Sequence, residues 1–415
     1  MNQWGHVNCC KNVECSFFGV IDTLYYQFIG QNGFCPECGD IFPLISPSAL
    51  SAFNQQSNKF YPQILLYCPT CGQGDALIRH GRGPAGAQRW RCRTCNSSFT
   101  DESTVIKDIP GLQPLAECIS AGGDFRLSGE KNQTLSRDLT RLAFSARVEQ
   151  VHLPIGSLSG EYSTITFTVE FNGSHNKLFV IATADNKTGC VIAVSTNYLP
   201  LKNGISPEWW YPSMPAESEV SPILVRKVFD KDRVISRRPF LFDIAYGPAN
   251  VRSNDPGTIV KPVLASYRHF ALVHALTHHR LLSVHHWLEH ECFIYGACLM
   301  ANRMDIAQQR CGISFVYEEG SLDATQRLRS ETVRSDIVWR DTWNCYSQKN
   351  YNLAVCHLTG KTNRSSFRQA TLKPARAFQE YLFRHPIWPQ LIRLAPRNVV
   401  HLLEYLAVEY NRGRR

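Results

Sequence analysis

The pattern of hydrophobic and polar positions changes after Pro154, where strand-like runs begin. Three β-rich runs follow and are joined by short polar turns, namely EYSTITFTVEF, KLFVIATADN and TGCVIAVSTNY. Helical and strand patterns then alternate in KPVLASYRHFALVHALTHH, RLLSVHHWLE, HECFIYGACLMANRMDIAQQR and GISFVYEE. This order predicts an α/β domain over residues 151–322, interrupted at about 200–256 by an insertion that contains one candidate strand, RRPFLFDIAYG.

Residues 104–150 have the pattern of three short helices. The first ends at Gly122 and Gly123, and the last, TLSRDLTRLAFSARV, is amphipathic. Its polar face carries or adjoins Arg137, Arg141 and Arg147. The segment predicts a helix-turn-helix whose last helix enters a DNA major groove, and a plain three-helix packing unit is an equal alternative.

The region from 323 to 415 is mostly helical in pattern and strongly basic. Residues 327–415 hold 16 Lys and Arg against 6 acids, a density that suits phosphate contacts. Regularly spaced cations predict a DNA-binding strip here, formed by Lys361, Arg364, Arg368, Lys373 and Arg376. The final amphipathic helix, NVVHLLEYLAVEYNR, is expected to pack against the protein before an exposed arginine-rich end.

Cysteines change this picture at the other end of the chain, because nine of the sixteen fall in the first 95 residues. Residues 67–103 contain two Cys-x2-Cys pairs twenty residues apart, which is the ligand spacing of a four-thiolate zinc ribbon. Residues 1–45 contain a variant, in which Cys9 is an alternative to Cys10 as a ligand. The predicted ligands of two structural Zn²⁺ ions are Cys10, Cys15, Cys35 and Cys38, and Cys68, Cys71, Cys92 and Cys95.

The arm between the two cysteine pairs of the second ribbon is basic and punctuated by Trp90. A metal-held basic hairpin favours an anionic partner, although a solvated basic face is the alternative. The residues predicted to bind double-stranded DNA here are Arg79, Arg82, Arg89, Arg91 and Arg93, with Arg137 and Arg141 added from the helical segment. Residues 46–66 are polar and predict a linker between the ribbons.

Composition and further motifs narrow the class of protein. The net charge is +9, and all of the excess lies after residue 150. The first residues lack the features of a signal peptide, and no eighteen apolar residues run together, so a cytoplasmic protein without a membrane span is expected. No phosphate-binding loop or hydrolase elbow is present. Seven of the fourteen histidines cluster between His269 and His290, and filling a helix face or lining a DNA path is favoured over metal binding.

Taken together, these segments resemble the DDE transposases of bacterial insertion sequences. The resemblance rests on CKNVECSFFG with FCPECG, on CPTCGQGDALIRHGRGPAGAQRWRCRTCNSSFT, on the helical segment and on the meander with ATADNKTGCVIAVSTNY. The expected fold is therefore multidomain α+β, with two zinc ribbons, a helix-turn-helix, an RNase H-like α/β domain and a basic helical C-terminal region. The resemblance also implies self-association or a larger protein assembly on DNA.

For such a family the resemblance implies three carboxylates that hold Mg²⁺ for strand cleavage and transfer. Matching them to this chain gives Glu170 in the first strand, Glu289 or Glu291 after the fourth, and Glu331 on a later helix, with Asp243 as a rival for the second position. These acids form no clean motif. Two functions therefore stay open, an active transposase-like nuclease and a catalytically inactive, domesticated DNA-binding protein that serves as a regulator, target selector or assembly component.

Overall fold

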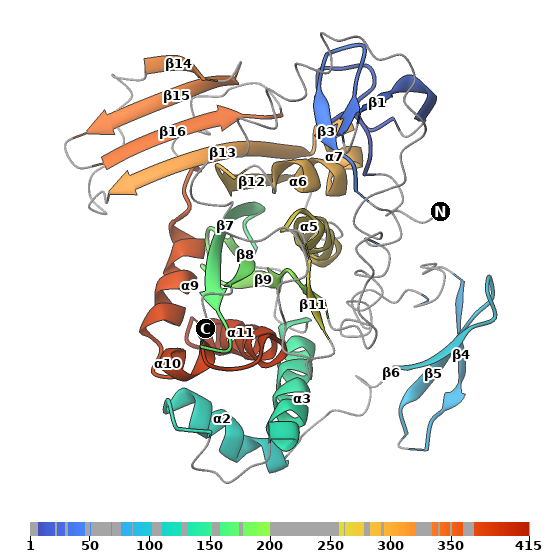
Figure 1. Ribbon diagram of the computed structural model, residues 1–415, viewed down its shortest axis with the longest axis vertical. Helices are drawn as coiled ribbons and strands as arrows, with labels where there is room; N and C mark the ends of the chain where they lie inside the picture. The colour runs from blue at the N-terminus through green and yellow to red at the C-terminus, as the bar shows by residue number, and fades with distance from the viewer. Residues whose placement is uncertain are drawn as a thin grey trace.

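The computed structural model gives a mixed α+β molecule with several sheets (Figure 1). The structure describes residues 7–20, 23–29, 32–45, 50, 68, 76–84, 86–101, 110–125, 132–151, 158–173, 177–199, 257–260, 262–277, 283–291, 294–320, 334–338, 341–348, 351–359 and 369–414. The expected linker at 46–66, apart from residue 50, and the expected insertion at 200–256 therefore lie outside the described residues.

An eight-stranded sheet forms the centre of the molecule, in the order β14-β15-β16-β13-β12-β7-β8-β9. The predicted meander is confirmed, because β7, β8 and β9 pair antiparallel. β12 then pairs parallel with β7, and β13 pairs parallel with β12, so the helices expected between these strands are present as crossovers. The strands of this part are β7 (Glu161–Glu170), β8 (Lys177–Asp185), β9 (Val191–Thr196), β12 (Val284–Glu289) and β13 (Cys311–Gly320).

The expectation that residues 323–415 are mostly helical is wrong for their first half. β14 (Arg334–Val338), β15 (Asp341–Gln348) and β16 (Tyr351–His357) continue the sheet antiparallel beyond β13. The runs DTWNCYSQ and YNLAVCH are rich in aromatic and β-branched residues, and β16 alternates buried and less buried positions at its start. β15 pairs antiparallel with β16 up to Gln348 and Tyr351, so the two strands form a hairpin that the basic composition had obscured.

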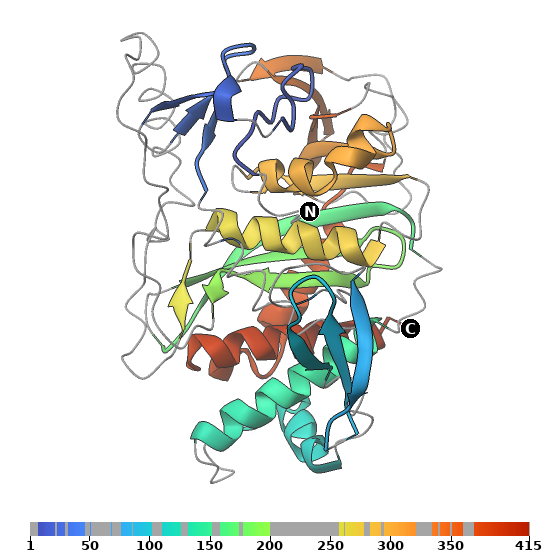
Figure 2. The same cartoon turned by 90° about the vertical axis from the view of Figure 1, so that its right-hand side faces the viewer.

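Helices cover both faces of the sheet (Figures 1 and 2), and buried hydrophobic clusters include residues of both the helices and the sheet. One face carries α5 (Pro262–Thr277), α6 (Tyr295–Ala301) and α7 (Arg303–Ala307), whose core includes Phe270, Leu288 and Ile313. The opposite face carries α9 (Lys373–Arg384), α10 (Trp388–Leu391) and α11 (Pro396–Arg412). Small β10 (Tyr198–Leu199) and β11 (Thr258–Ile259) pair beside the sheet. The packing of the last helix was predicted correctly.

The segment expected to form a helix-turn-helix has two helices among the described residues. η3 (Pro110–Leu112) leads into α2 (Gln113–Ser120), which ends before Gly122 at a φ of +68°, as the sequence predicted. α3 (Asn132–Val151) packs against α11. Arg147, expected on or near the polar face, is instead 2% exposed and contacts Glu404 of α11. One face of α3 is thus part of the main core.

Two small antiparallel sheets complete the molecule. One contains η1 (Thr23–Tyr25) beside β1 (Gln27–Ile29), β2 (Asn32–Phe34) and β3 (Ile41–Pro43). The other consists of β4 (Leu77–Arg82), β5 (Gln88–Cys92) and β6 (Ser98–Asp101). Across the described ranges, no helix has the length and apolar character needed to cross a membrane.

Candidate metal centres and nucleic-acid interface

Four cysteines of the first small sheet converge on one point. The sulfurs of Cys10, Cys15, Cys35 and Cys38 all lie within 4.8 Å of one another. Cys10 Sγ is 3.5 Å from Cys38 Sγ, and Cys15 Sγ is 3.8 Å from Cys35 Sγ. Sulfurs at about 2.3 Å from a tetrahedral Zn²⁺ stand about 3.8 Å apart, so the donor set fits this ion. We call residues 7–45 ribbon 1.

The second small sheet holds a matching group of sulfurs. Cys68, Cys92 and Cys95 lie within 4.8 Å of one another, and Cys68 Sγ is 3.4 Å from Cys95 Sγ. The predicted fourth ligand, Cys71, lies outside the described residues. We call residues 68–101 ribbon 2, and its three described sulfurs fit three corners of a Zn²⁺ tetrahedron.

The closing cysteine pairs of the two ribbons have the same backbone geometry. In ribbon 1 the Gly39 amide donates to the Cys35 carbonyl at 2.8 Å, and in ribbon 2 the Asn96 amide donates to the Cys92 carbonyl at 2.9 Å. Both residues have positive φ, +74° for Gly39 and +59° for Asn96, which glycine and asparagine tolerate best. The two sequences FCPECGD and RCRTCNS therefore build one kind of metal-binding turn.

Burial and hydrogen bonds shift the pKa values of the ribbon 1 thiols in different directions. Burial raises the pKa of Cys10, and it raises the pKa of Cys15 to about 11. The pKa of Cys38 is lowered despite its burial, because backbone and side-chain hydrogen bonds favour its thiolate. Zn²⁺ binding would have to displace protons from the thiols, which makes the affinity fall as the pH falls.

Cys9, the alternative ligand, points away from the metal group. Its thiol donates to the Met300 sulfur of α6 at 3.3 Å, and its side chain is fully buried. The neighbouring Lys11 is buried too, and its ammonium donates to the carbonyls of Val7 and Cys9 while lying 4.8 Å from the centre of the Phe42 ring. Ribbon 1 therefore shares a hydrophobic core with α5 and α6.

Ribbon 2 presents a different surface. In β5, exposed residues alternate with partly buried ones, so that Arg89 and Arg91 are exposed while Trp90 is partly buried. On β6 the directly opposite partners are Thr100 for Arg89 and Ser98 for Arg91. Two guanidinium groups and two hydroxyls thus share one face of the sheet, and all four are donors that suit phosphate oxygens.

Ribbon 2 carries further cations, although Arg79 and Arg82 stand opposite Trp90 and Gln88 and therefore lie on the other face of the sheet. Arg79, Arg82 and Arg93 are exposed as well, and so is His80. Within the described ranges, no carboxylate forms an ion pair with any of the five arginines of ribbon 2. The sequence predicted the arginines but not Ser98 and Thr100. The alternation of polar and aromatic residues in SSFT, opposite the alternation in RWRC, is the pattern that could have placed these hydroxyls beside the arginines.

Predicted DNA-binding residues elsewhere have protein partners. Arg137 and Arg141 of α3 are exposed and both contact Asp138, at 3.2 and 3.5 Å. Lys373 lies 3.9 Å from the Glu318 carboxylate, and Arg376 donates to the Glu318 carbonyl at 2.6 Å, so both join α9 to β13. Three members of the predicted strip lie outside the described residues, namely Lys361, Arg364 and Arg368.

The predicted catalytic acids are not brought together in the described residues. Glu289 accepts hydrogen bonds from the amide and hydroxyl of Thr166, at 2.9 and 3.0 Å. Glu170 lies four residues further along β7, about 13 Å at the usual rise of a strand. Glu291 is buried just after β12. Glu331 lies outside the described residues, and so does Asp243, the rival for the second position.

Other carboxylates of the sheet have structural partners. Asp185, at the end of β8, accepts from the Ser159 amide and hydroxyl and from the Thr188 amide and hydroxyl. Glu318 accepts from the Tyr351 hydroxyl and the Leu372 amide. In the described part of the chain, the two cysteine groups are the clusters with metal-ligand geometry, and no carboxylate cluster accompanies them.

Three histidines of the cluster fill packed positions, whereas His290 is exposed. His269 of α5 is buried between the hydroxyls of Thr183 and Ser195, at 2.7 and 3.0 Å, and its desolvation lowers the pKa to about 3. His285 stacks on Trp287, and burial lowers the pKa of His285 and of His286 to about 3. These imidazoles are neutral parts of the core.

Comparison with known proteins assigns the class of ribbon 2. Residues 64–96 match the family model of the InsA N-terminal domain, a zinc ribbon. The chain is 38% identical over 50 residues to the insertion element iso-IS1N protein InsA of Shigella dysenteriae. That stretch is 12% of this chain and 54% of the relative, so the chain spans about half the length of the curated protein it matches. No solved structure matches the chain.

Proposed function

We propose that this chain is a DNA-binding protein related to insertion elements, and that ribbon 2 is its principal contact with double-stranded DNA. The observation that carries the proposal is the sheet face on which Arg89, Arg91, Ser98 and Thr100 stand together. Its similarity to the InsA zinc-ribbon domain supports the same proposal. Ribbon 1 has no comparable face, because its strands QFI, NGF and IFP contain no cation.

The test measures duplex binding by fluorescence anisotropy at several salt concentrations. Replacing both Arg89 and Arg91 by Gln should weaken binding about 10- to 100-fold at physiological salt and make binding less sensitive to salt, because two phosphate contacts are lost. The matched control is the double variant Arg310→Gln and Arg412→Gln, which removes two exposed charges paired with Asp305 and Glu149. Equal loss in both double variants would mean that net charge, and not ribbon 2, governs binding.

The central sheet supports an RNase H-like assignment for residues 151–322. Its strands run in the order β9-β8-β7-β12-β13, with an antiparallel meander followed by two parallel strands. We propose that this domain serves here as a scaffold that does not cleave DNA. The separation of Glu170 from Glu289 supports this, because two Mg²⁺ ions about 4 Å apart need ligands gathered at one place.

A cleavage assay distinguishes the scaffold from the alternative, an active transposase-like nuclease. The parent protein should leave supercoiled and linear DNA intact in Mg²⁺ or Mn²⁺. Cleavage that is lost in Glu289→Gln or Glu170→Gln would establish the nuclease instead. Light scattering with and without DNA tests the self-association that the resemblance to transposases implies.

A further inference from the structure

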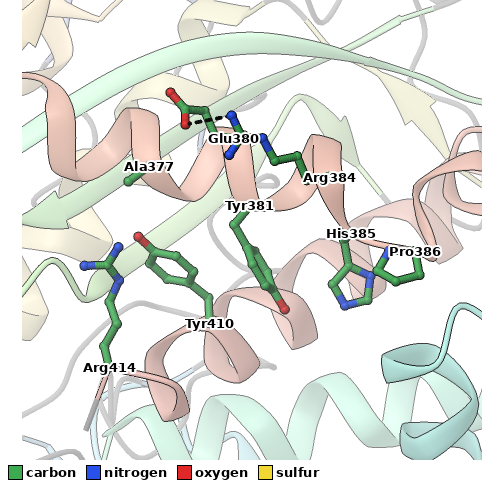
Figure 3. A pocket seen from close by; sticks show the side chains of 8 residues that line it. All are labelled: Ala377, Glu380, Tyr381, Arg384, His385, Pro386, Tyr410 and Arg414. Carbon is green, nitrogen blue, oxygen red and sulfur yellow. Dashed lines mark ion pairs between the residues drawn. The ribbon is translucent and has the colours of Figure 1, made fainter. Parts of the chain in front are cut away.

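A pocket lies between α9 and α11, on the face of the molecule that carries the C-terminal helices (Figure 3). Its volume is about 430 Å³, which is within the range of small-molecule sites. Ala377, Tyr381 and Pro386 give it an apolar side, and two cations line it as well, Arg384 at the end of α9 and Arg414 just beyond α11. Neither the sequence motifs nor the DNA-binding proposal uses this place.

The pocket favours an anion because its acids are already paired. Glu380 is exposed and lies 3.7 Å from Arg384 on the same helix, a contact that solvent weakens. Glu409 lies beneath the pocket and accepts hydrogen bonds from Tyr381, Ser120 and His385. These bonds lower the pKa of Glu409 and occupy its oxygens. Arg414 therefore has no carboxylate partner within the described residues.

Tyr410 carries a donor that nothing in the described protein uses. Tyr410 is 8% exposed, and among the described residues its buried hydroxyl donates to no acceptor. The Arg414 guanidinium covers the ring, 4.5 Å from its centre, but a guanidinium can only donate, so the phenol proton lacks an acceptor. Burial raises the pKa of Tyr410, which keeps that proton on the hydroxyl at neutral pH. A buried donor left without an acceptor destabilises a protein, and a ligand oxygen would remove this cost.

We propose that this pocket binds a phosphate group, held by the Arg414 and Arg384 guanidiniums and by the Tyr410 hydroxyl. An entering oxyanion meets the exposed Arg414 first, and as that side chain turns toward the anion it uncovers the hydroxyl below. A phosphate has enough oxygens to accept from two guanidiniums and a phenol together, and the apolar side accommodates the group attached to it. The phosphate belongs to a free nucleotide or to the DNA backbone.

Titration calorimetry of the full chain tests the proposal with inorganic phosphate and adenosine 5′-monophosphate, and with adenosine and acetate as probes that lack a phosphate. We expect both phosphate compounds to bind more tightly than adenosine or acetate. Tyr410→Phe should weaken their binding about 3- to 10-fold, and Arg414→Gln about 10-fold or more, in line with hydrogen bonds to a charged group.

Two controls separate a ligand site from a structural role. Arg412→Gln removes the same charge two residues away, but Arg412 contacts Glu149 of α3, so this variant should keep its phosphate affinity. Tyr410→Phe should leave the thermal midpoint unchanged or raise it, because it deletes an unpaired buried hydroxyl. Loss of phosphate binding in a protein that is no less stable identifies the hydroxyl as a ligand donor.

Measuring duplex binding by the same variants distinguishes a DNA backbone phosphate from the phosphate of a free nucleotide. If Tyr410→Phe weakens duplex binding and adenosine 5′-monophosphate competes with DNA, the pocket takes a backbone phosphate. If only mononucleotide binding weakens, it takes a free nucleotide, and the ribbon 2 variants keep that binding. Absence of phosphate binding at millimolar concentration, equal affinity for acetate, or unchanged affinity in Tyr410→Phe and Arg414→Gln would overturn the proposal.

Discussion

At the residue scale, adjacent cysteines have opposite roles. Cys10 faces the sulfur group, whereas Cys9 faces Met300 in the core. The sequence left the two as alternatives, since ligand spacing alone allows either. What decides between them is the direction in which successive side chains leave the backbone, and that depends on packing against α6, a helix almost 300 residues away in the chain.

This difference gives a prediction for metal content. Cys10→Ser should lower the zinc bound per chain from two ions to about one, because a three-sulfur site holds zinc far more weakly. Cys9→Ser should keep two ions. Mass spectrometry of the purified proteins under native conditions measures both. Loss of an ion in Cys9→Ser and not in Cys10→Ser would reverse the assignment.

Surface arginines were predictable one by one, but their partners were not. The exposure of Arg89 and Arg91 follows from strict alternation along β5, a local rule that the sequence reveals. The engagement of Lys373 and Arg376 by Glu318 does not follow from local sequence, because β13 and α9 meet only through the fold. Charge density thus did not show that the cations at the start of α9 already contact the protein, Lys373 at an exposed position and Arg376 at a partly buried one.

At the element scale, the two ribbons share a metal-binding turn but differ in how they are attached. Ribbon 1 contributes Cys9, Tyr26 and Phe42 to a core that also contains α5 and α6. The strands of ribbon 2 pair only with one another in the described structure. Sequence spacing predicted both ribbons, whereas the docking of ribbon 1 depends on distant apolar residues that spacing does not report.

The attachment predicts different consequences of losing each metal. We use main domain for the part of the chain built on the eight-stranded sheet. Cys35→Ser in ribbon 1 should lower the free energy of unfolding of this domain by about 2–4 kcal/mol, because the apolar contacts that ribbon 1 shares with it are lost along with the zinc turn. Cys92→Ser in ribbon 2 should leave main-domain unfolding within about 0.5 kcal/mol of the parent and abolish most DNA binding. Urea unfolding followed by circular dichroism and by anisotropy separates the two effects. A similar loss of stability in both variants would contradict the difference in attachment.

At the scale of the whole molecule, the order of strands was the most predictable feature and the extent of the sheet the least. β8 is apolar at every position from Leu178 to Ala182 because both faces of the sheet are covered, and such runs are strong strand signals. The hairpin β15–β16 was hidden because its polar, basic neighbourhood suggested a helical arm. Its strand character depends on pairing with β13, which is a tertiary effect.

Buried neutral histidines predict acid sensitivity of the whole fold. His269, His285 and His286 have folded-state pKa values of about 3, below the usual 6.5 of an unfolded histidine. The unfolded chain therefore binds more protons below pH 6.5, and stability is lost as the pH falls from there toward 3. Each histidine contributes up to about 1.4 kcal/mol per pH unit in that window.

Thermal unfolding of zinc-saturated protein at pH 7.5, 6.5 and 5.5 measures this effect. The midpoint should change little between the first two values and fall clearly at the third. His269→Gln should be less stable than the parent at every pH, since two hydrogen bonds change. Between pH 6.5 and 5.5, however, its stability should fall less than that of the parent, by the contribution of one proton bound to the unfolded chain. An identical slope in parent and variant would show that His269 does not control the transition.

The docking of ribbon 1 has a consequence for the life of the protein in a cell. Because one zinc ion secures part of the main core, a chain made when zinc is scarce would hold that core less firmly and open more often to proteases. Zinc scarcity would then reduce the amount of this protein, and not only the DNA binding proposed for it. The abundance of the intact chain would follow the supply of a metal ion that takes no part in any reaction it performs.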